Sequence, residues 1–428
     1  MSNSIKRKSH FAARHLSICL ALSLSSMWMM TATAQQAPLS TNADLPPIWQ
    51  LGGHPAPGPN TRENQPFKID PTKPVIVHGP LILDPSETSA TIEWITDTPC
   101  IAKVLYGEGS LDHVAEPQEN GMLPVGTLHR IELTGLQPGR TYQYQLESTQ
   151  VVRLKPYQPE MGLGLESPTY SFTTFDRAKA TAAFNTITDT HGLPERVRAI
   201  SKLIDWKDTD FLVHTGDGVD WVDTEDQVFN TWLDPIGEAL HHEKPLIYAR
   251  GNHDYRGPFA RQLADYLAAP EHRFYFSRDD GPLHLIVIDT GEDKPDETKA
   301  YSGLLRQAPY RAEELAWFRD HFVTDKRAQS APFRVVVMHQ PDWGWLDQKN
   351  NEWTEVANQG KVDLVIAGHF HHFVHFAKGV AGNEFPVLSI APDETAHVEA
   401  TADELRVTVI KTDGSIVDKF TLPRRGKQ

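Results

Sequence analysis

The chain has 428 residues, of which 39% are hydrophobic and 23% charged, and its formal net charge is −15. This length exceeds what one ordinary domain core needs, so we expect two domains of an ordinary soluble globular protein. So acidic a surface repels nucleic-acid backbones and anionic membranes, which argues against a nucleic-acid polymer as partner.

The first residues have the pattern of a secretory signal peptide. Basic residues precede an apolar run from Leu16 to Met30, and Ala32-Thr33-Ala34 supplies a small-x-small cleavage signal. We predict a signal peptide at residues 1–34 and an exported protein, periplasmic or secreted. The apolar run is short for a membrane span, so no stable membrane insertion is expected. Cleavage would remove Cys19 and leave Cys100 alone, which excludes an intramolecular disulfide.

The next region reads as an arm followed by an all-β domain. Residues 35–74 are rich in Pro, Gly and Asn without a sustained period, which predicts an extended arm or linker. From 75 to 176, short alternating segments separated by turn residues predict a β-sandwich. Within it, Leu133–Tyr144 contains a leucine, a Pro-Gly turn and a tyrosine in an order that resembles the fibronectin type III signature. These residues are expected to pack a core and to carry no chemistry.

From about Ala180 the pattern changes to apolar strands that alternate with helical spacing. This alternation predicts a layered α/β (αββα) domain over residues 180–422 with buried sheets. Strands are expected at 183–188, 210–214, 246–249, 283–288, 333–338 and 362–367, and helices at 193–203 and 309–322. The tail from Phe385 returns to strand-like alternation and is expected to complete the second sheet.

Nearly every predicted α/β strand runs directly into His, Asp or Asn. The loops concerned are Asp189-Thr190-His191-Gly192, Gly216-Asp217-Gly218-Val219-Asp220, Gly251-Asn252-His253-Asp254, His339, and Gly368-His369-Phe370-His371. The carboxyl ends of strands line the ligand crevice in layered α/β folds, so we expect these five loops to converge. Any one of these side chains alone would more often be a loop cap or a satisfied core residue. The ordered set indicates a common site.

The chemistry of this set favours metal ions. Carboxylates gathered without Lys or Arg would repel one another and bear a desolvation cost if no cation lay between them. A mixture of carboxylate, imidazole and amide groups without thiolates suits Mn, Fe, Zn or Co. Six or more side-chain ligands exceed what one catalytic ion needs, so we predict two ions bridged by one carboxylate.

The five motifs, in this order, resemble the calcineurin-like metallophosphoesterases. The resemblance covers about Ala180 to His371, and the β-sandwich in front of it is similar to the arrangement in purple acid phosphatases and their bacterial relatives. It implies hydrolysis of a phosphate ester with two divalent or trivalent metal ions. It further implies that Asp217 bridges the metals and that His253, oriented by Asp254, acts at the leaving-group oxygen as general acid or transition-state clamp. The implied ligands are Asp189, His191 and His371 for one metal and Asn252, His339 and His369 for the other.

One departure from purple acid phosphatases has chemical consequences. Those enzymes have a tyrosine ligand three residues after the bridging aspartate, and glycine where His191 stands in this chain. Here the tyrosine position is Asp220, which we expect to orient a ligand. Without a phenolate ligand, we expect no tyrosinate–iron charge transfer, no purple colour and a weaker preference for Fe³⁺.

Some residues near the motifs are candidates for contacting the substrate. Arg250, Tyr255 and Trp343 flank the third and fourth motifs and could contact substrate, although the tryptophan is at least as easily explained by loop packing. Residues 289–304 are polar and show no clear element, which suggests a lid.

The leading functional prediction is a phosphomonoesterase acting on a small phosphate ester. The alternative is a phosphodiesterase for cyclic nucleotides, glycerophosphodiesters or phospholipid head groups, since the same dimetal chemistry serves both. A catalytically silent binding or adhesion protein, in which the β-sandwich does the work, is the third reading. Homodimerisation through that domain is left open.

Overall fold

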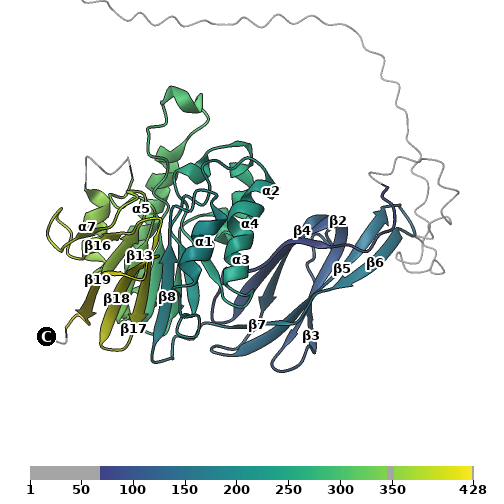
Figure 1. Cartoon of the computed structure of the whole chain (residues 1–428), viewed down its shortest axis with the longest axis horizontal. Coiled ribbons are helices and arrows are strands. Elements are labelled where there is room, and N and C mark those ends of the chain that lie inside the picture. The colour runs from purple at the N-terminus through teal and green to yellow at the C-terminus, as the bar shows by residue number, and fades with distance from the viewer. Residues whose placement is uncertain (1–67, 345–350, 427–428) are drawn as a thin grey trace, which may run out of the picture. The chain divides into compact units, whose positions relative to one another are not determined.

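The computed structural model describes residues 68–344 and 351–426 (Figure 1). The signal peptide expected at 1–34 and most of the arm expected at 35–74 lie outside these residues. Residues 68–74 contain neither helix nor strand. Within the described part, every helix is too short or too polar to cross a membrane.

The first third of the described chain is an all-β region. Its strands are β1 (Ile76–Leu83), β2 (Ser89–Gly107), β3 (His113–Ala115), β4 (Gly126–Thr134), β5 (Thr141–Arg153), β6 (Glu160–Glu166) and β7 (Tyr170–Thr173). The 19-residue strand β2 pairs with β1, β3, β4 and β5, so all seven strands form one hydrogen-bonded network. Side chains alternate between outside and inside, and Trp94, Tyr144 and Phe172 are buried in the core. Cys100 is buried and has no disulfide partner among the described residues.

The rest of the described chain contains two six-stranded mixed sheets. The first has the order β10-β9-β8-β17-β18-β19 and the second β11-β12-β13-β14-β16-β15. The first sheet comprises β8 (Ala182–Ile187), β9 (Phe211–His214), β10 (Leu246–Tyr248), β17 (Glu394–Ala400), β18 (Glu404–Lys411) and β19 (Ile416–Pro423). The second comprises β11 (Phe276–Asp280), β12 (Leu283–Val287), β13 (Phe333–Val337), β14 (Leu364–Ala367), β15 (Val374–Phe376) and β16 (Val387–Ser389). In each sheet the central strands that precede the polar loops are parallel.

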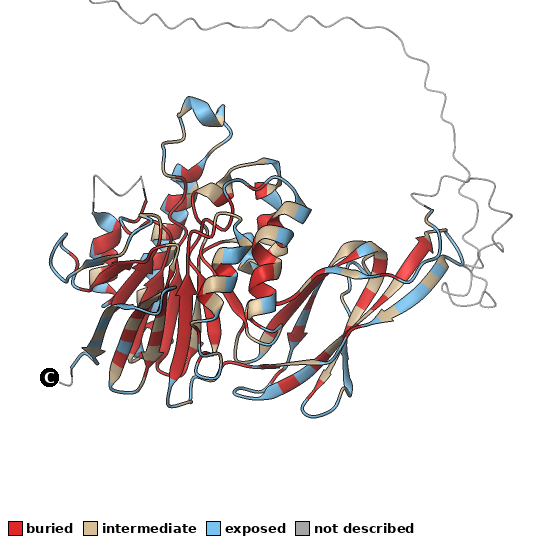
Figure 2. Cartoon of the chain, viewed as in Figure 1, coloured by how far each residue is buried: buried red, intermediate tan, exposed pale blue. Residues whose placement is uncertain are grey.

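The two sheets pack against each other and are covered by helices on their outer faces. One core cluster joins Phe184 and Val213 of the first sheet to Val335 and Ile366 of the second. Strands buried on both faces read as continuous apolar runs, and Figure 2 shows these strands largely buried. The helices are α1 (Pro194–Ser201), α2 (Glu225–Val228), η2 (Phe229–Leu233), α3 (Asp234–Ala239), η3 (His253–Tyr255), η4 (Pro258–Gln262), α4 (Leu263–Tyr266), η5 (Pro270–His272), η6 (Lys299–Tyr301), α5 (Gln307–Thr324), α6 (Lys326–Ser330) and α7 (Glu352–Gln359).

The helical faces explain the layer order. Val197 and Ile236, from α1 and α3, share a cluster with Leu212 of the first sheet. Phe318 and Val356, from α5 and α7, share another with strands of the second sheet. The expected layered α/β architecture is therefore present as helix, sheet, sheet, helix.

The expectation for the tail is only partly correct. Strand β16 joins the second sheet, as expected, but β17, β18 and β19 extend the first sheet beside β8. The physical reason is the register, in which Val398 pairs with Phe184 and both side chains are buried in the core between the sheets. Alternation within a strand marks its buried face but does not say which sheet supplies the neighbour.

Candidate metal centre

All five polar loops begin where a strand of the two sheets ends. The loops follow β8, β9, β10, β13 and β14, so the parallel strands direct them to one edge of the domain. Several of the predicted ligands have left-handed backbone conformations, which are costly for residues other than glycine and cluster at functional sites. Their φ angles are 50° for Asp189, 50° for His191, 54° for Asp217, 73° for His369 and 56° for His371.

The first cluster consists of Asp189, His191 and His371, whose ligating atoms all lie within 4.8 Å of one another. Asp189 Oδ1 lies 3.1 Å from His371 Nε2 and 3.8 Å from His191 Nε2. The other carboxylate oxygen accepts hydrogen bonds from Thr188 Oγ1 at 2.6 Å and from the amide of His369 at 3.0 Å. One oxygen and two imidazole nitrogens therefore face a common point.

The second cluster consists of Asp217, His339 and His369. Asp217 Oδ2 lies 3.1 Å from His339 Nε2, and Asp217 Oδ1 accepts a hydrogen bond from the His253 amide at 2.9 Å. Nδ1 of His339 donates to the Thr215 carbonyl at 2.7 Å, which leaves the Nε2 lone pair directed at the cluster.

Several buried oxygen and nitrogen atoms in this pocket accept no hydrogen bond from the described part of the chain, as expected for a site that binds a cation. Asp189 Oδ1, Asn252 Oδ1 and His339 Nε2 are all buried and accept no hydrogen bond from any described residue. Leaving such atoms without a partner is costly, and buried polar atoms are normally satisfied by protein, water or metal. Carboxylate oxygen, amide oxygen and imidazole nitrogen are the donors that borderline first-row metals accept. The residues present therefore fit metal ions.

Asp220 contacts the first cluster. Its Oδ1 lies 2.7 Å from His191 Nδ1, so the ring donates from Nδ1 and turns Nε2 toward Asp189 and His371. A residue that orients a ligand would make this kind of contact, and that role stays a prediction for Asp220.

The expected contact between Asp254 and His253 is absent from the described structure. The Asp254 carboxylate accepts from the amides of Asp217, Gly218 and Gly251 and from the Tyr248 hydroxyl. His253 instead places Nδ1 2.8 Å from the Asp220 carbonyl. The reason is burial: Asp254 is fully buried, and three backbone amides and the Tyr248 hydroxyl already satisfy its oxygens. Burial, reinforced by the charge of Asp217, raises its pKa to about 6.

Arg250 and Tyr255 form a buried cluster instead of contacting the ligand residues. Arg250 Nε lies 2.9 Å from Asp289 Oδ2, and its guanidinium carbon lies 3.7 Å from the centre of the Tyr255 ring. The Tyr255 hydroxyl also donates to Asp289. Asp289 is fully buried and requires a cation, which accounts for the direction of both side chains.

Trp343 packs its own loop, which was the alternative to a substrate contact. It is 4% exposed, stacks on Trp353 and donates from Nε1 to Thr354 Oγ1 at 3.0 Å. The neutral polar atom is thus satisfied within the loop.

Sequence reasoning missed the role of the acidic residues in the segment expected to form a lid. Glu292 is fully buried and receives Arg256 Nε at 2.8 Å, and Arg256 Nη1 donates to His253 Nε2 at 3.0 Å. The signal available was the arginine that follows the third motif, but its acidic partner lies 36 positions later.

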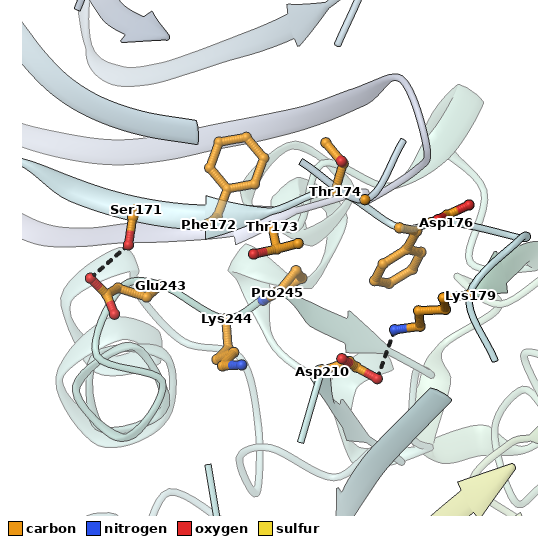
Figure 3. A pocket seen from close by; sticks show the side chains of 12 residues that line it. Ser171, Phe172, Thr173, Thr174, Asp176, Lys179, Asp210, Glu243, Lys244 and Pro245 are labelled. Atoms are coloured by element: carbon orange, nitrogen blue, oxygen red, sulfur yellow. Dashed lines mark hydrogen bonds and ion pairs between the residues drawn. The ribbon is translucent and has the colours of Figure 1, made fainter. Parts of the chain in front are cut away.

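Two cavities border the site and a third does not. One of about 450 Å³ is lined by Phe370, which stands between His369 and His371. Another of about 580 Å³ is lined by Arg256. The third, of about 370 Å³, lies where β7 meets the α/β domain, and its walls include the Ser171–Glu243 and Lys179–Asp210 pairs (Figure 3). None of its lining residues belongs to the five loops.

Comparisons with known proteins agree with this geometry. Residues 184–373 match the family model described as calcineurin-like phosphoesterase. The chain is 25% identical over 197 residues to purple acid phosphatase 4 of Arabidopsis thaliana, covering 42% of this chain and 57% of that protein. It is 27% identical over 186 residues to purple acid phosphatase 17 of the same plant, covering 40% of this chain and 55% of that protein. The chain thus matches little more than half the length of these relatives.

Solved structures show the same fold. Purple acid phosphatase PPD1 from yellow lupin superposes with a TM-score of 0.61 at 15% identity, covering 85% of this chain and 76% of that chain. PhoD superposes with a TM-score of 0.53 at 12% identity, covering 81% and 92%.

Proposed function

We propose that the chain is a metal-dependent phosphoric ester hydrolase acting as a phosphomonoesterase, because residues 184–373 match the calcineurin-like phosphoesterase model and purple acid phosphatases are among the similar proteins. The observation that carries the proposal is the pair of donor clusters with three buried atoms, on Asp189, Asn252 and His339, that accept no hydrogen bond from the described residues. The groups 3.1 Å from Asp189 Oδ1 and His339 Nε2 are themselves candidate ligands. A chain without a cation at this place would leave those atoms unsatisfied at a cost.

The proposal assigns two metal positions. Asp189, His191 and His371 would hold the first, and Asn252, His339 and His369 would hold the second. Asp217 would be the carboxylate shared by both; its Oδ2 faces His339, and its backbone amide is held by Asp254. When bound, Mn, Fe, Zn or Co would neutralise phosphoryl oxygens and lower the pKa of a water molecule. No phenolate ligand is available at Asp220, so the loaded protein should lack the purple charge-transfer band.

His253 is proposed to act at the leaving-group oxygen through Nε2. Its Nδ1 lies 2.8 Å from the Asp220 carbonyl and therefore carries a proton, which leaves Nε2 directed away from the backbone. Nε2 lies 3.9 Å from Asp217 Oδ2, so it stands beside the proposed bridging carboxylate. Arg256 Nη1 donates to the same Nε2 at 3.0 Å, so the guanidinium supplies a cationic donor at this position.

A phosphodiesterase is the second candidate, and one observation favours it. Separate cavities of about 450 and 580 Å³ border the loops of Phe370 and Arg256, so both ester groups of a diester would have room. In either case the reaction is proposed to take place outside the cytoplasm, because residues 1–34 have the pattern of a signal peptide.

The test compares two chromogenic substrates on metal-loaded protein. Hydrolysis of p-nitrophenyl phosphate and of bis-p-nitrophenyl phosphate is measured for the unmodified chain, for Asp217→Asn and for Asp320→Asn. Asp320 is an exposed residue of α5 whose carboxylate has no partner among the described residues, so it controls for the change in charge. We expect Asp217→Asn to lose at least ~100-fold in kcat while the control stays within about twofold.

Two results would reject the proposal or a part of it. Full activity in Asp217→Asn would remove this carboxylate from the reaction. Elemental analysis giving one ion per fully loaded chain would reject the dimetal assignment but keep the hydrolase. The ratio of rates on the two substrates decides between the monoesterase and the diesterase.

A further inference from the structure

The segment between β12 and α5 is fastened to the loop after β10 by buried ion pairs. Asp289 and Glu292 are both fully buried, and they receive Arg250 and Arg256 respectively. The segment ends at Gln307, the first residue of α5. The amide of Gln307 donates to Asp296 Oδ1 at 3.0 Å. Residues 289–296 are therefore anchored at several points, and we term the whole segment 289–307 the wall.

This wall borders the candidate metal centre. Arg256 Nη1 lies 3.0 Å from His253 Nε2, and that nitrogen lies 3.9 Å from Asp217 Oδ2. A phosphate group held at the two clusters would therefore have Arg256 and the wall on its His253 side. This is the side proposed for the leaving group.

Two adjoining cavities open along the wall and form what we term the cationic groove. Their volumes are about 580 and 380 Å³, and they share Tyr255, Arg261, Leu304 and Leu305 as lining residues. The described lining residues include no Asp or Glu, although the chain carries a net charge of −15. The cationic residues that line the groove are Arg250, Arg256, Arg261, Lys294 and Arg306.

Only two of these cations are left to bind an incoming anion. Arg250 is paired with Asp289, Arg256 with Glu292 and Asp293, and Lys294 with Asp293. Within residues 68–344 and 351–426, neither Arg261 nor Arg306 has an ion pair. Both side chains are exposed, so a ligand could reach them.

We propose that the cationic groove binds the alcohol part of the substrate and that Arg261, with Arg306, binds a second anionic group on it. The inference rests on the proposed phosphatase activity and specifies its substrate class: phosphate monoesters whose alcohol carries a further phosphate or carboxylate. The planar guanidinium forms paired hydrogen bonds to both kinds of group, which a purely apolar cavity does not offer. Leu304, 69% exposed, and Leu305 supply apolar contact for the carbon skeleton between the two anions.

The kinetic test uses two substrates that differ by one carboxylate. Hydrolysis of phenyl phosphate and of 4-carboxyphenyl phosphate is compared in the unmodified protein, Arg261→Gln, Arg306→Gln and Arg261→Lys. Arg140→Gln is the matched control, because Arg140 is an exposed arginine of the front β domain. We expect Arg261→Gln to lower kcat/KM about tenfold on the carboxylated substrate alone, through KM, as one charge-assisted hydrogen bond is lost. Arg306→Gln should act in the same direction, and Arg261→Lys should recover part of the loss.

A binding measurement separates this inference from the proposed reaction. Calorimetry compares benzylphosphonate with 4-carboxybenzylphosphonate, neither of which is hydrolysed. Tighter binding of the carboxylated compound that depends on Arg261 supports the groove, even if the protein hydrolyses no ester and the proposed function fails. Equal binding of the two compounds overturns the groove. The groove is also overturned if the protein is an active phosphatase and Arg261→Gln lowers kcat/KM equally on both substrates, or on neither.

Discussion

The carboxylate of Asp254 lies 2.8 Å from the backbone amide of Asp217 and accepts its hydrogen bond. It also accepts the amides of Gly218 and Gly251, at 3.1 and 2.9 Å, so one buried side chain joins the loops after β9 and β10. Asp254 therefore acts on the candidate metal centre through the position of Asp217, not through His253.

Replacing Asp254 by Ala should leave three buried amides without an acceptor. We expect the free energy of unfolding of the metal-free protein to fall by roughly 3 kcal/mol, measured by urea unfolding followed by circular dichroism. The matched control is Tyr248→Phe, which removes a single hydroxyl donor to the same carboxylate and should cost about 1 kcal/mol. Equal stability of Asp254→Ala and the unmodified protein would show that the amides find water instead.

Asp220 should tune metal affinity without being a ligand itself. Its Oδ1 receives His191 Nδ1 at 2.7 Å, and Asp220→Asn would weaken the orientation of that ring. We expect metal to bind about 10- to 100-fold more weakly, measured by competition with a chromogenic chelator. Asp223→Asn, a neutralised exposed aspartate three positions later, should leave affinity unchanged. If the two variants behave alike, the effect is one of surface charge.

Gly251 is required by the close approach of two loops. A methyl group at this position would lie 2.2 Å from both the amide nitrogen and Oδ1 of Asp217. Gly251→Ala should therefore displace Asp217 and abolish tight metal binding, with a lowered thermal midpoint. Gly126→Ala in β4 is the control, because no described atom lies within 4 Å of the added methyl group. Metal binding of normal strength in Gly251→Ala would mean that the loops can separate without loss.

The front β domain should make stability depend on pH through His129. Burial lowers the pKa of His129 to about 4, whereas an exposed histidine titrates near 6.5. Between these values the unfolded chain binds a proton that the folded chain does not, so stability falls as the pH drops from 6.5 towards 4. In this range the free energy of unfolding of the unmodified protein should change with pH by about 1.4 kcal/mol per unit more than that of His129→Gln.

Urea midpoints recorded between pH 7 and 4.5 measure that difference. His113→Gln, at an exposed histidine of the same domain, should keep the slope of the unmodified protein. If the urea midpoints of His129→Gln and of the unmodified protein change in parallel with pH, the His129 imidazole is protonated within the fold.

The loops of the candidate site could be predicted from sequence because their signal is local. An apolar strand such as Phe333–Val337, followed after Met338 by His339, marks both the element and its functional end. The left-handed conformations of Asp189 and His369 leave no comparable mark, since neither residue is glycine.

The contacts that fix the site could not be predicted, because their partners are distant in the chain. Arg250 meets Asp289 across 39 positions, and nothing in either neighbourhood specifies the pairing. From the sequence, loop packing explains Trp343 at least as well as a substrate contact does. In the structure, its contacts with Trp353 and Thr354 favour packing. A polar segment such as 289–304 reads as a mobile lid when its buried acids cannot be matched to arginines.

Strand β8 lies between β9 and β17 in the first sheet, and its partner β17 begins more than 200 positions after β8 ends. The loop that carries Asp189 and His191 directly follows β8. One edge of β8 therefore stays unpaired until residues 394–400, which form β17, have been synthesised. During synthesis, the donor groups of the first cluster cannot reach their final positions while the ribosome still holds that stretch. A cation captured earlier would meet an incomplete set of ligands, so loading with metal should come after residues 394–400 have joined the sheet.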